Sequence, residues 1–264
     1  MIDLIKGITK QKKSEVSERN LSDNANSPTQ GRVGGETNIG IVTSELRWFF
    51  RNKKISGITK TMLDLHQHFR DTFPVTSKLL DLSKVTECQI DDCLYRLYEW
   101  RTKNGNSCGW VCRIEVEIPN LELINEHLLL LKYIGGIEES WDQYDETEIK
   151  SPFTLNQNFM FIGAKCSRGM GLNKKAYLEE CRRQNLESLK MLDDLIVFAK
   201  EANGNLTFYD SNDGEVYLYA HDHNFNYVES IIGQPDYSFY RITGCSSFIE
   251  YVEKLSSDWL EVVD

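Results

Sequence analysis

The segment from Leu195 to Ala220 constrains the fold more than any other part of the chain. Leu195–Ala199 is a short apolar run, Leu206–Tyr209 is a second, and apolar and aromatic residues alternate along Glu215–Ala220. The last two runs are separated by Asn212-Asp213-Gly214, whose residue types tolerate the positive φ that tight turns require. The pattern predicts antiparallel strands, of which the last two form a hairpin.

A capped amphipathic helix is predicted beyond this region. Ser247 and Glu250 have the spacing of a capping box, in which each side chain accepts a hydrogen bond from the other residue's backbone. The apolar face of this helix consists of Phe248, Val252, Leu255 and Trp259. Together with a further strand expected within Tyr237–Ile242, the pattern predicts an α+β fold with a mainly antiparallel sheet flanked by helices.

The remaining elements are predicted from apolar spacing. Spacings of three and four residues predict helices over Thr59–Phe69, Ile90–Arg101, Leu121–Ile134 and Lys174–Leu192. Asn120 is the expected N-cap of the third of these helices, and the Gly135-Gly136 pair is its expected stop. Strands are expected over Trp110–Ile118 and within Phe153–Ile162, whereas Thr43–Phe50 fits either a short helix or a strand.

Composition divides the chain into three parts. From Ser22 to Gly35 the residues are mostly Ser, Asn, Asp, Gly, Pro, Thr and Gln, which bury too little apolar surface to offset the entropy of ordering. We therefore predict a flexible tail or linker over residues 1–38. A helical and strand extension is expected over 39–118, and the main domain over 119–264.

Bulk charge and cysteine content restrict the partners and the compartment. The 264 residues include 40 Asp and Glu against 30 Lys and Arg, giving a net charge of −10. This field repels nucleic-acid phosphates and attracts a basic protein, although the same charge also serves solubility alone. Seven cysteines, no recognisable signal peptide and no long apolar run lead us to expect a cytoplasmic protein that does not engage membranes.

The predicted sheet resembles the central sheet of the SUKH superfamily, which comprises bacterial immunity proteins and fungal cell-wall-assembly regulators. The resemblance lies in Leu195–Asp222, with its Gly-rich turn Ala202–Asn205, a strand ending in Asp210, and the run Gly214–Tyr217. Two further segments, Leu128–Gly136 and Ser246–Tyr251, are similar to helices of that family.

Other parts of the chain depart from the family pattern. The Leu-Pro-x-x-Tyr motif that usually begins the family's domain is only partly matched, by Ile118–Leu121. The stretch 137–194 is longer than in compact members of the family, and residues 1–110 have no counterpart in it. The resemblance implies a binding scaffold without catalytic residues or a cofactor. Because many relatives neutralise toxins, often nucleases, we expect an immunity protein that binds a basic toxin domain. The alternative is a regulatory scaffold for cell-envelope or signalling proteins.

An acidic segment at Glu138–Glu148 is the best candidate for the partner-binding surface. It holds six acids, no Lys or Arg, one Trp and one Tyr, so it offers both steering charge and anchoring area. The predicted partner-binding residues are Glu138, Glu139, Trp141, Asp142, Tyr144, Asp145 and Glu146. The alternative is that Trp141 is a core residue and the acids form a solvated rim. The loop His221–Asp236 is the second choice of surface.

Motifs for catalysis or metal binding are weak. His221-Asp222-His223 has the donor atoms of a zinc site and suggests a metal-dependent hydrolase, but alternate residues of a strand point to opposite sides. Cys88, Cys93, Cys108 and Cys112 lack the spacing of common zinc knuckles and fit buried thiols better. The turn at Asp210–Glu215 departs from a calcium loop. We expect no catalytic residue, no metal site and no cofactor.

Overall fold

The computed structural model describes residues 47–114, 121–142, 160–161, 166–201, 204–221 and 227–264. All of them belong to the compact unit Asn38–Asp264. The predicted tail, and the predicted boundary between residues 118 and 119, lie outside the described residues. Within those ranges, no helix combines the length and the hydropathy that crossing a bilayer demands.

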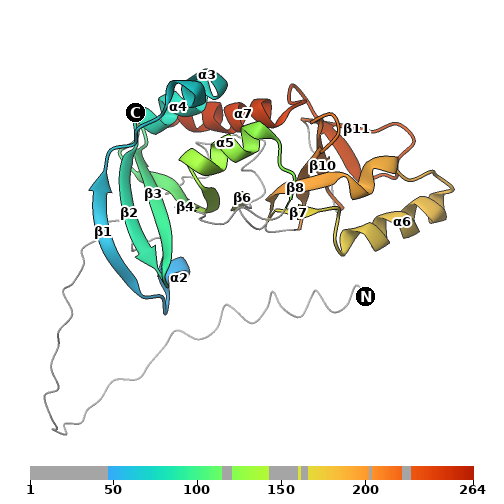
Figure 1. The fold of residues 1–264 in the computed structure, drawn as a ribbon. Helices are drawn as coiled ribbons and strands as arrows, with labels where there is room; N and C mark the ends of the chain where they lie inside the picture. The colour runs from blue at the N-terminus through green and yellow to red at the C-terminus, as the bar shows by residue number, and fades with distance from the viewer. Residues whose placement is uncertain (1–46, 115–120, 143–159, 162–165, 202–203, 222–226) are drawn as a thin grey trace, which may run out of the picture. The chain divides into compact units, whose positions relative to one another are not determined.

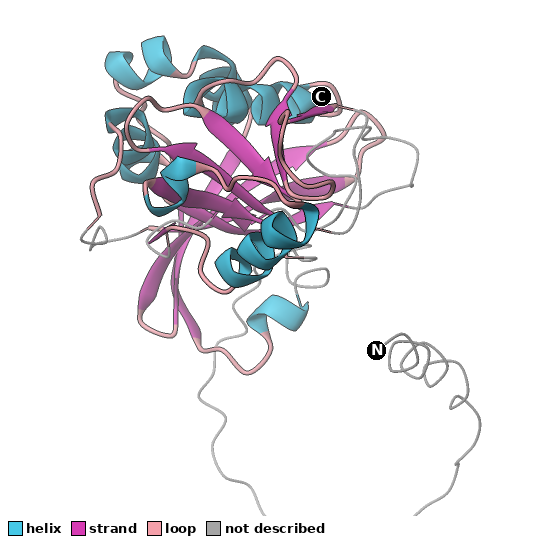
Figure 2. Cartoon of the chain, turned by 90° about the vertical axis from the view of Figure 1, so that its right-hand side faces the viewer, coloured by secondary structure: helices cyan, strands magenta, loops and turns pink. Residues whose placement is uncertain are grey.

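Two antiparallel sheets form the centre of this unit, with helices at their periphery (Figures 1 and 2). The five-stranded sheet has the order β1-β2-β3-β4-β5, made of Ile55–Thr61, Lys84–Ile90, Cys93–Arg101, Ser107–Arg113 and Gly136–Asp142. The seven-stranded sheet has the order β11-β12-β10-β9-β8-β6, with β7 also pairing with β8. In chain order its strands are β6 Met160–Phe161, β7 Ser167–Arg168, β8 Leu195–Lys200, β9 Leu206–Asp210, β10 Val216–Tyr219, β11 Val228–Ser230 and β12 Phe239–Ile242. The predicted α+β fold with antiparallel sheets is confirmed.

The helices predicted over Leu121–Ile134 and Lys174–Leu192 are shorter in the structure. The described helices are α2 Arg47–Phe50, α3 Gln67–Thr72, α4 Pro74–Asp81, α5 Asn125–Tyr133, α6 Asn173–Gln184, the 3-10 helix η1 Lys190–Asp193, and α7 Phe248–Leu260. The N-cap of α5 is Ile124, so the expected cap at Asn120 is wrong. Its end agrees with the prediction, because Gly135 adopts a positive φ of 83° just beyond the helix. Asn185, in the left-handed conformation, ends α6.

The predicted hairpin and the last helix are confirmed. β9 pairs with β10 in a register that places Phe208 opposite Tyr217. At the start of α7, the Ser247 hydroxyl accepts from the Glu250 amide at 3.3 Å, and the Glu250 carboxylate accepts from the Ser247 amide at 3.1 Å. The two reciprocal bonds satisfy backbone donors that the helix itself cannot pair.

The helices predicted for Thr59–Phe69 and Ile90–Arg101 are wrong. β1 runs to Thr61 and α3 begins only at Gln67. The second segment is mainly strand β3, in which Leu97 lies opposite Val111 and Tyr98 lies opposite Trp110. Both pairs are buried, one in the cluster on each face of the sheet. Because both faces of β3 are covered, its apolar residues do not alternate and imitate a helical spacing.

Helix α7 packs against both sheets and joins their cores (Figure 1). Near its start, the Phe248 ring lies 5.1 Å from the Phe198 ring of β8. Near its end, the Trp259 ring lies 5.5 Å from Trp100 and 5.4 Å from Trp110, both of the five-stranded sheet. These side chains are buried in one continuous apolar cluster, so a single helix completes two sheet cores.

A carboxylate from α7 also caps α4. Pro74 occupies the first turn of α4, and its N-cap residue Phe73 makes no side-chain cap bond. Instead, the Glu253 carboxylate accepts from the backbone amides of Val75 at 2.8 Å and Thr76 at 2.9 Å, and from the Thr76 hydroxyl at 2.8 Å. Glu253 thus satisfies orphan donors of a helix that lies far away in the sequence.

We expect Glu253→Ala to lower the free energy of unfolding by about 2 kcal/mol, because it leaves part-buried helix amides without their charged acceptor. Urea unfolding followed by circular dichroism measures the change. Ser257→Ala, at an exposed position of the same helix, is the control and is expected to leave the midpoint almost unchanged. Equal stability of Glu253→Ala and the wild type would contradict the capping role.

Candidate functional site

The predicted partner-binding surface begins in a strand rather than in an acidic loop. Glu138, Glu139, Trp141 and Asp142 belong to β5, an edge strand of the five-stranded sheet. This part of the prediction is therefore corrected. Tyr144, Asp145 and Glu146 lie outside the described residues, as does the side chain of Asp142.

A bulge in β5 explains why neither of the adjacent residues Glu138 and Glu139 is exposed. The register with β4 shifts between Val111 and Cys112, so that Glu138 is an extra residue of β5. The Glu138 carboxylate accepts from the Tyr95 hydroxyl at 2.9 Å and lies 3.9 Å from the Arg113 guanidinium. Glu139 is only 2% exposed. Burial, followed by the nearby Glu138 charge, raises the pKa of Tyr95. These two acids face protein groups more than solvent.

Trp141 is a core residue, the alternative that the sequence left open. Its side chain is 4% exposed, and its indole Nε1 donates to the Ser107 hydroxyl at 3.2 Å. The ring lies over Gly109, where an added Cβ would meet the Trp141 Cη2 atom at 2.1 Å. Glycine is therefore required beneath the ring, and in this conformation Trp141 is not available as an exposed anchor.

The other motifs do not form a site in the described part of the chain. The exposed His221 ring stacks on Tyr219 with centroids 6.4 Å apart, while Asp222 and His223 lie outside the described residues. Cys88, Cys108 and Cys112 are buried and Cys93 is half-buried. Among the residues that the structure describes, no three His, Cys, Asp or Glu side chains form a group suited to a metal ion.

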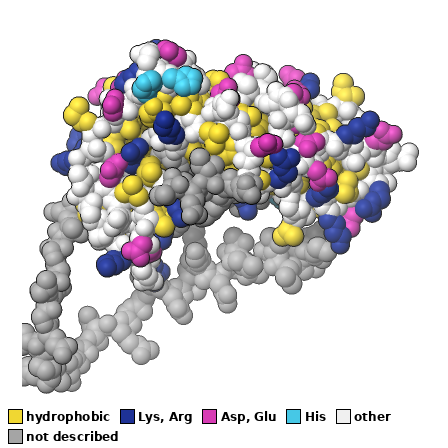
Figure 3. Space-filling model, in the orientation of Figure 1, with side chains coloured by type: hydrophobic (Ala, Val, Ile, Leu, Met, Phe, Trp, Pro, Cys, Tyr) yellow, Lys and Arg dark blue, Asp and Glu magenta, His cyan; other side chains and the backbone are white. Residues whose placement is uncertain are grey.

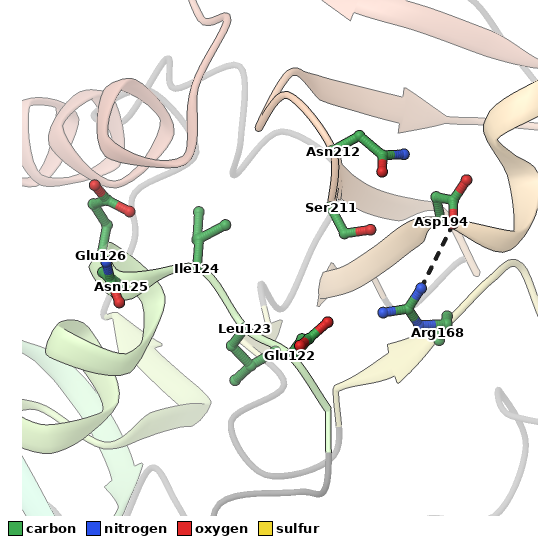
Figure 4. Close-up of a pocket in the computed structure, with 9 residues that line it drawn as sticks. All are labelled: Glu122, Leu123, Ile124, Asn125, Glu126, Arg168, Asp194, Ser211 and Asn212. Carbon is green, nitrogen blue, oxygen red and sulfur yellow. Dashed lines mark ion pairs between the residues drawn. The ribbon is translucent and has the colours of Figure 1, made fainter.

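A polar pocket in a different place is the best candidate site. It has a volume of about 530 Å³ and lies between the segment leading into α5 and the ends of β7, β8 and β9 (Figure 4). One side is formed by Glu122, Leu123, Ile124, Asn125 and Glu126. The other is formed by Arg168, Asp194, Ser211 and Asn212.

The hairpin turn after β9 shapes the second wall. The Asp210 carboxylate accepts from both the backbone and the side-chain amide of Asn212, each at 2.9 Å. The Ser211 amide donates to the carbonyl of Asp194 at 3.0 Å, which ties the turn to the start of β8. Asp210, which the family resemblance singles out, therefore holds a residue that lines the pocket.

The pocket is acidic. Its lining includes the carboxylates of Glu122, Glu126 and Asp194 and one guanidinium, that of Arg168. Arg168 lies 3.6 Å from Asp194, so its charge is already opposed within the same wall. In contrast, acidic and basic side chains are interspersed over the molecular face in Figure 3. The pocket is thus a local concentration of negative charge suited to a cationic group.

Sequence reasoning missed this pocket because its charged residues come from separate elements. Glu122 and Glu126 precede or begin α5, Arg168 is in β7, and Asp194 follows η1. None of them forms a short motif, and the sheet pairing brings them together. Comparison of the chain with protein families, curated proteins and solved structures finds no match.

Proposed function

We propose that this chain is a non-enzymatic binding protein of the immunity type, which captures a basic toxin domain in the cytoplasm. The observation that carries the proposal is the pocket, which is lined by three acidic residues and by one arginine whose charge is already paired. The net charge of −10 favours the same kind of partner by attracting it over longer distances. The SUKH-like order of segments supports the immunity assignment in particular.

In this proposal the partner inserts a lysine or arginine side chain between Glu122 and Glu126 on one wall and Asp194 on the other. A guanidinium can form paired hydrogen bonds with carboxylates, and such contacts are shorter and stronger than neutral ones. The toxin is inhibited by occlusion, so the immunity protein needs neither turnover nor a cofactor. Trp141 is then a core residue and not the aromatic anchor of the interface.

The neutralising activity is tested with the gene immediately upstream of this one. Expression of that gene alone is expected to arrest growth, and co-expression of this chain is expected to restore it. Growth arrest that persists when both proteins are produced would contradict the immunity role.

The role of the pocket is tested with the double variant Glu122→Gln, Glu126→Gln. Removing both charges is expected to weaken toxin binding by roughly ten- to a hundredfold, because in this proposal both carboxylates contact the inserted cation. Calorimetry or surface plasmon resonance at low and high salt measures the effect. The matched control Glu179→Gln, Glu187→Gln removes the same charge from exposed positions outside the pocket and outside the loop His221–Asp236. If both double variants bind alike, only the overall charge matters and the pocket is not the contact.

A further inference from the structure

Three buried polar side chains lie among the elements that form the acidic pocket. His127 Nδ1 lies 3.1 Å from the Tyr209 hydroxyl, and His127 Nε2 lies 3.7 Å from the Cys166 thiol. All three side chains are more than nine-tenths buried. The cluster joins α5, the end of β9 and the residue before β7. Helix α5, strand β7 and the turn that follows β9 each contribute lining residues.

Each member of the cluster lies next to a residue of the pocket. His127 follows Glu126, Tyr209 is two residues before Ser211, and Cys166 is two residues before Arg168. Tyr209 therefore contacts α5, the helix that carries Glu126, through its hydrogen bond with His127. Ile124, the N-cap residue of α5, itself lines the pocket (Figure 4).

The chemistry of the cluster suits a structural role better than catalysis. Burial lowers the pKa of His127 to about 3 and raises the pKa of Cys166 to about 12. At neutral pH the imidazole and the thiol are thus both uncharged, whereas a nucleophilic Cys–His pair requires a thiolate. Neutral, fully buried hydrogen bonds fix geometry because breaking one leaves a polar atom unsatisfied.

We propose that Tyr209, together with His127 and Cys166, is the positioning unit that sets the distance between the two walls of the acidic pocket. The proposal rests on the proposed function, in which that pocket receives a cationic side chain. Tyr209 acts through His127 and does not itself touch the bound cation. Its hydroxyl determines where the carboxylates of Glu122 and Glu126 stand relative to Arg168 and Asp194.

The test compares Tyr209→Phe with Tyr177→Phe. Both changes delete one buried phenol hydroxyl and keep the ring, but the Tyr177 hydroxyl lies on α6, where it accepts from the Leu189 amide at 2.8 Å. Two quantities are measured on the full chain: binding of a fluorescein-labelled polyarginine peptide, and amide hydrogen exchange of residues Leu128 to Leu130 in α5 without peptide.

Tyr209→Phe is expected to weaken peptide binding roughly tenfold and to speed exchange in α5, while Tyr177→Phe changes neither. Binding by Tyr209→Phe at wild-type strength, or an equal loss in both variants, would overturn the positioning role. If the wild type fails to bind the peptide, the cationic pocket itself is wrong. The exchange data then still decide on positioning, because equal exchange at Leu128–Leu130 in both variants would overturn it.

Discussion

Trp259→Ala is expected to lower the free energy of unfolding by about 3–5 kcal/mol, the range for truncating a large buried aromatic side chain. Trp259 is 2% exposed and lies between Trp100 and Trp110 of the five-stranded sheet. Removing its indole leaves a cavity between α7 and that sheet, and the neighbouring rings lose an edge-to-face partner. Urea unfolding at neutral pH measures the loss.

Phe248→Ala is the matched change at the other end of α7, where the ring packs on the seven-stranded sheet, and a loss of similar size is expected. Because one helix completes both cores, each variant is expected to unfold in a single transition, observed alike by tryptophan fluorescence and by circular dichroism. Two separate transitions, with Trp259→Ala affecting only the five-stranded sheet, would contradict a shared core.

Acid is expected to unfold the protein largely through His127. Its pKa is about 3 in the folded protein and 6.5 when exposed, because burial disfavours the charged imidazole. Above pH 6.5 the group is neutral in both states and stability is complete. As the pH falls from 6.5 towards 3, only the unfolded state binds the proton, so stability falls by about 1.4 kcal/mol per pH unit and about 5 kcal/mol altogether.

The variant His127→Gln isolates this contribution. Glutamine keeps a hydrogen-bonding group for Tyr209 but does not titrate. Its stability at neutral pH is expected to be lower than that of the wild type, yet to decline less steeply with acid. Urea midpoints measured at a series of pH values between about 7 and 4 give both slopes, and equal slopes would contradict the assignment.

The parts of the fold that were predictable from sequence carry local turn and cap signals. Asn212-Asp213-Gly214 marked the β9–β10 hairpin, and Ser247 with Glu250 marked the start of α7. The β2–β3 hairpin lacks such a signal, because its turn is Asp91-Asp92 and contains no glycine. Both residues nevertheless adopt positive φ, 49° and 68°. Because the sequence carries no turn signal between β2 and β3, and because β3 is buried on both faces, its apolar spacing predicts a helix instead of a strand.

The candidate site was less predictable than the fold. The segment beginning at Glu138 looked like a solvent-exposed acidic loop because six acids occur within a few residues. A β-bulge and pairing with β4 instead bring Glu138 into contact with Tyr95 and Arg113, and Glu139 is buried. Bulges depend on the register between strands, which is a tertiary property. The pocket at Arg168 depends on sheet pairing in the same way, so the density of charge along the sequence does not indicate it.

The position of α7 has a consequence for synthesis of the chain. Every strand that the structure describes precedes α7 in the sequence, so both sheets leave the ribosome before the helix that covers them. Until α7 emerges, Trp100, Trp110 and Phe198 lack their main apolar partner and are exposed to other chains. Partly synthesised chains are therefore prone to aggregate, and holding chaperones should bind them in proportion to the time that translation of α7 is delayed.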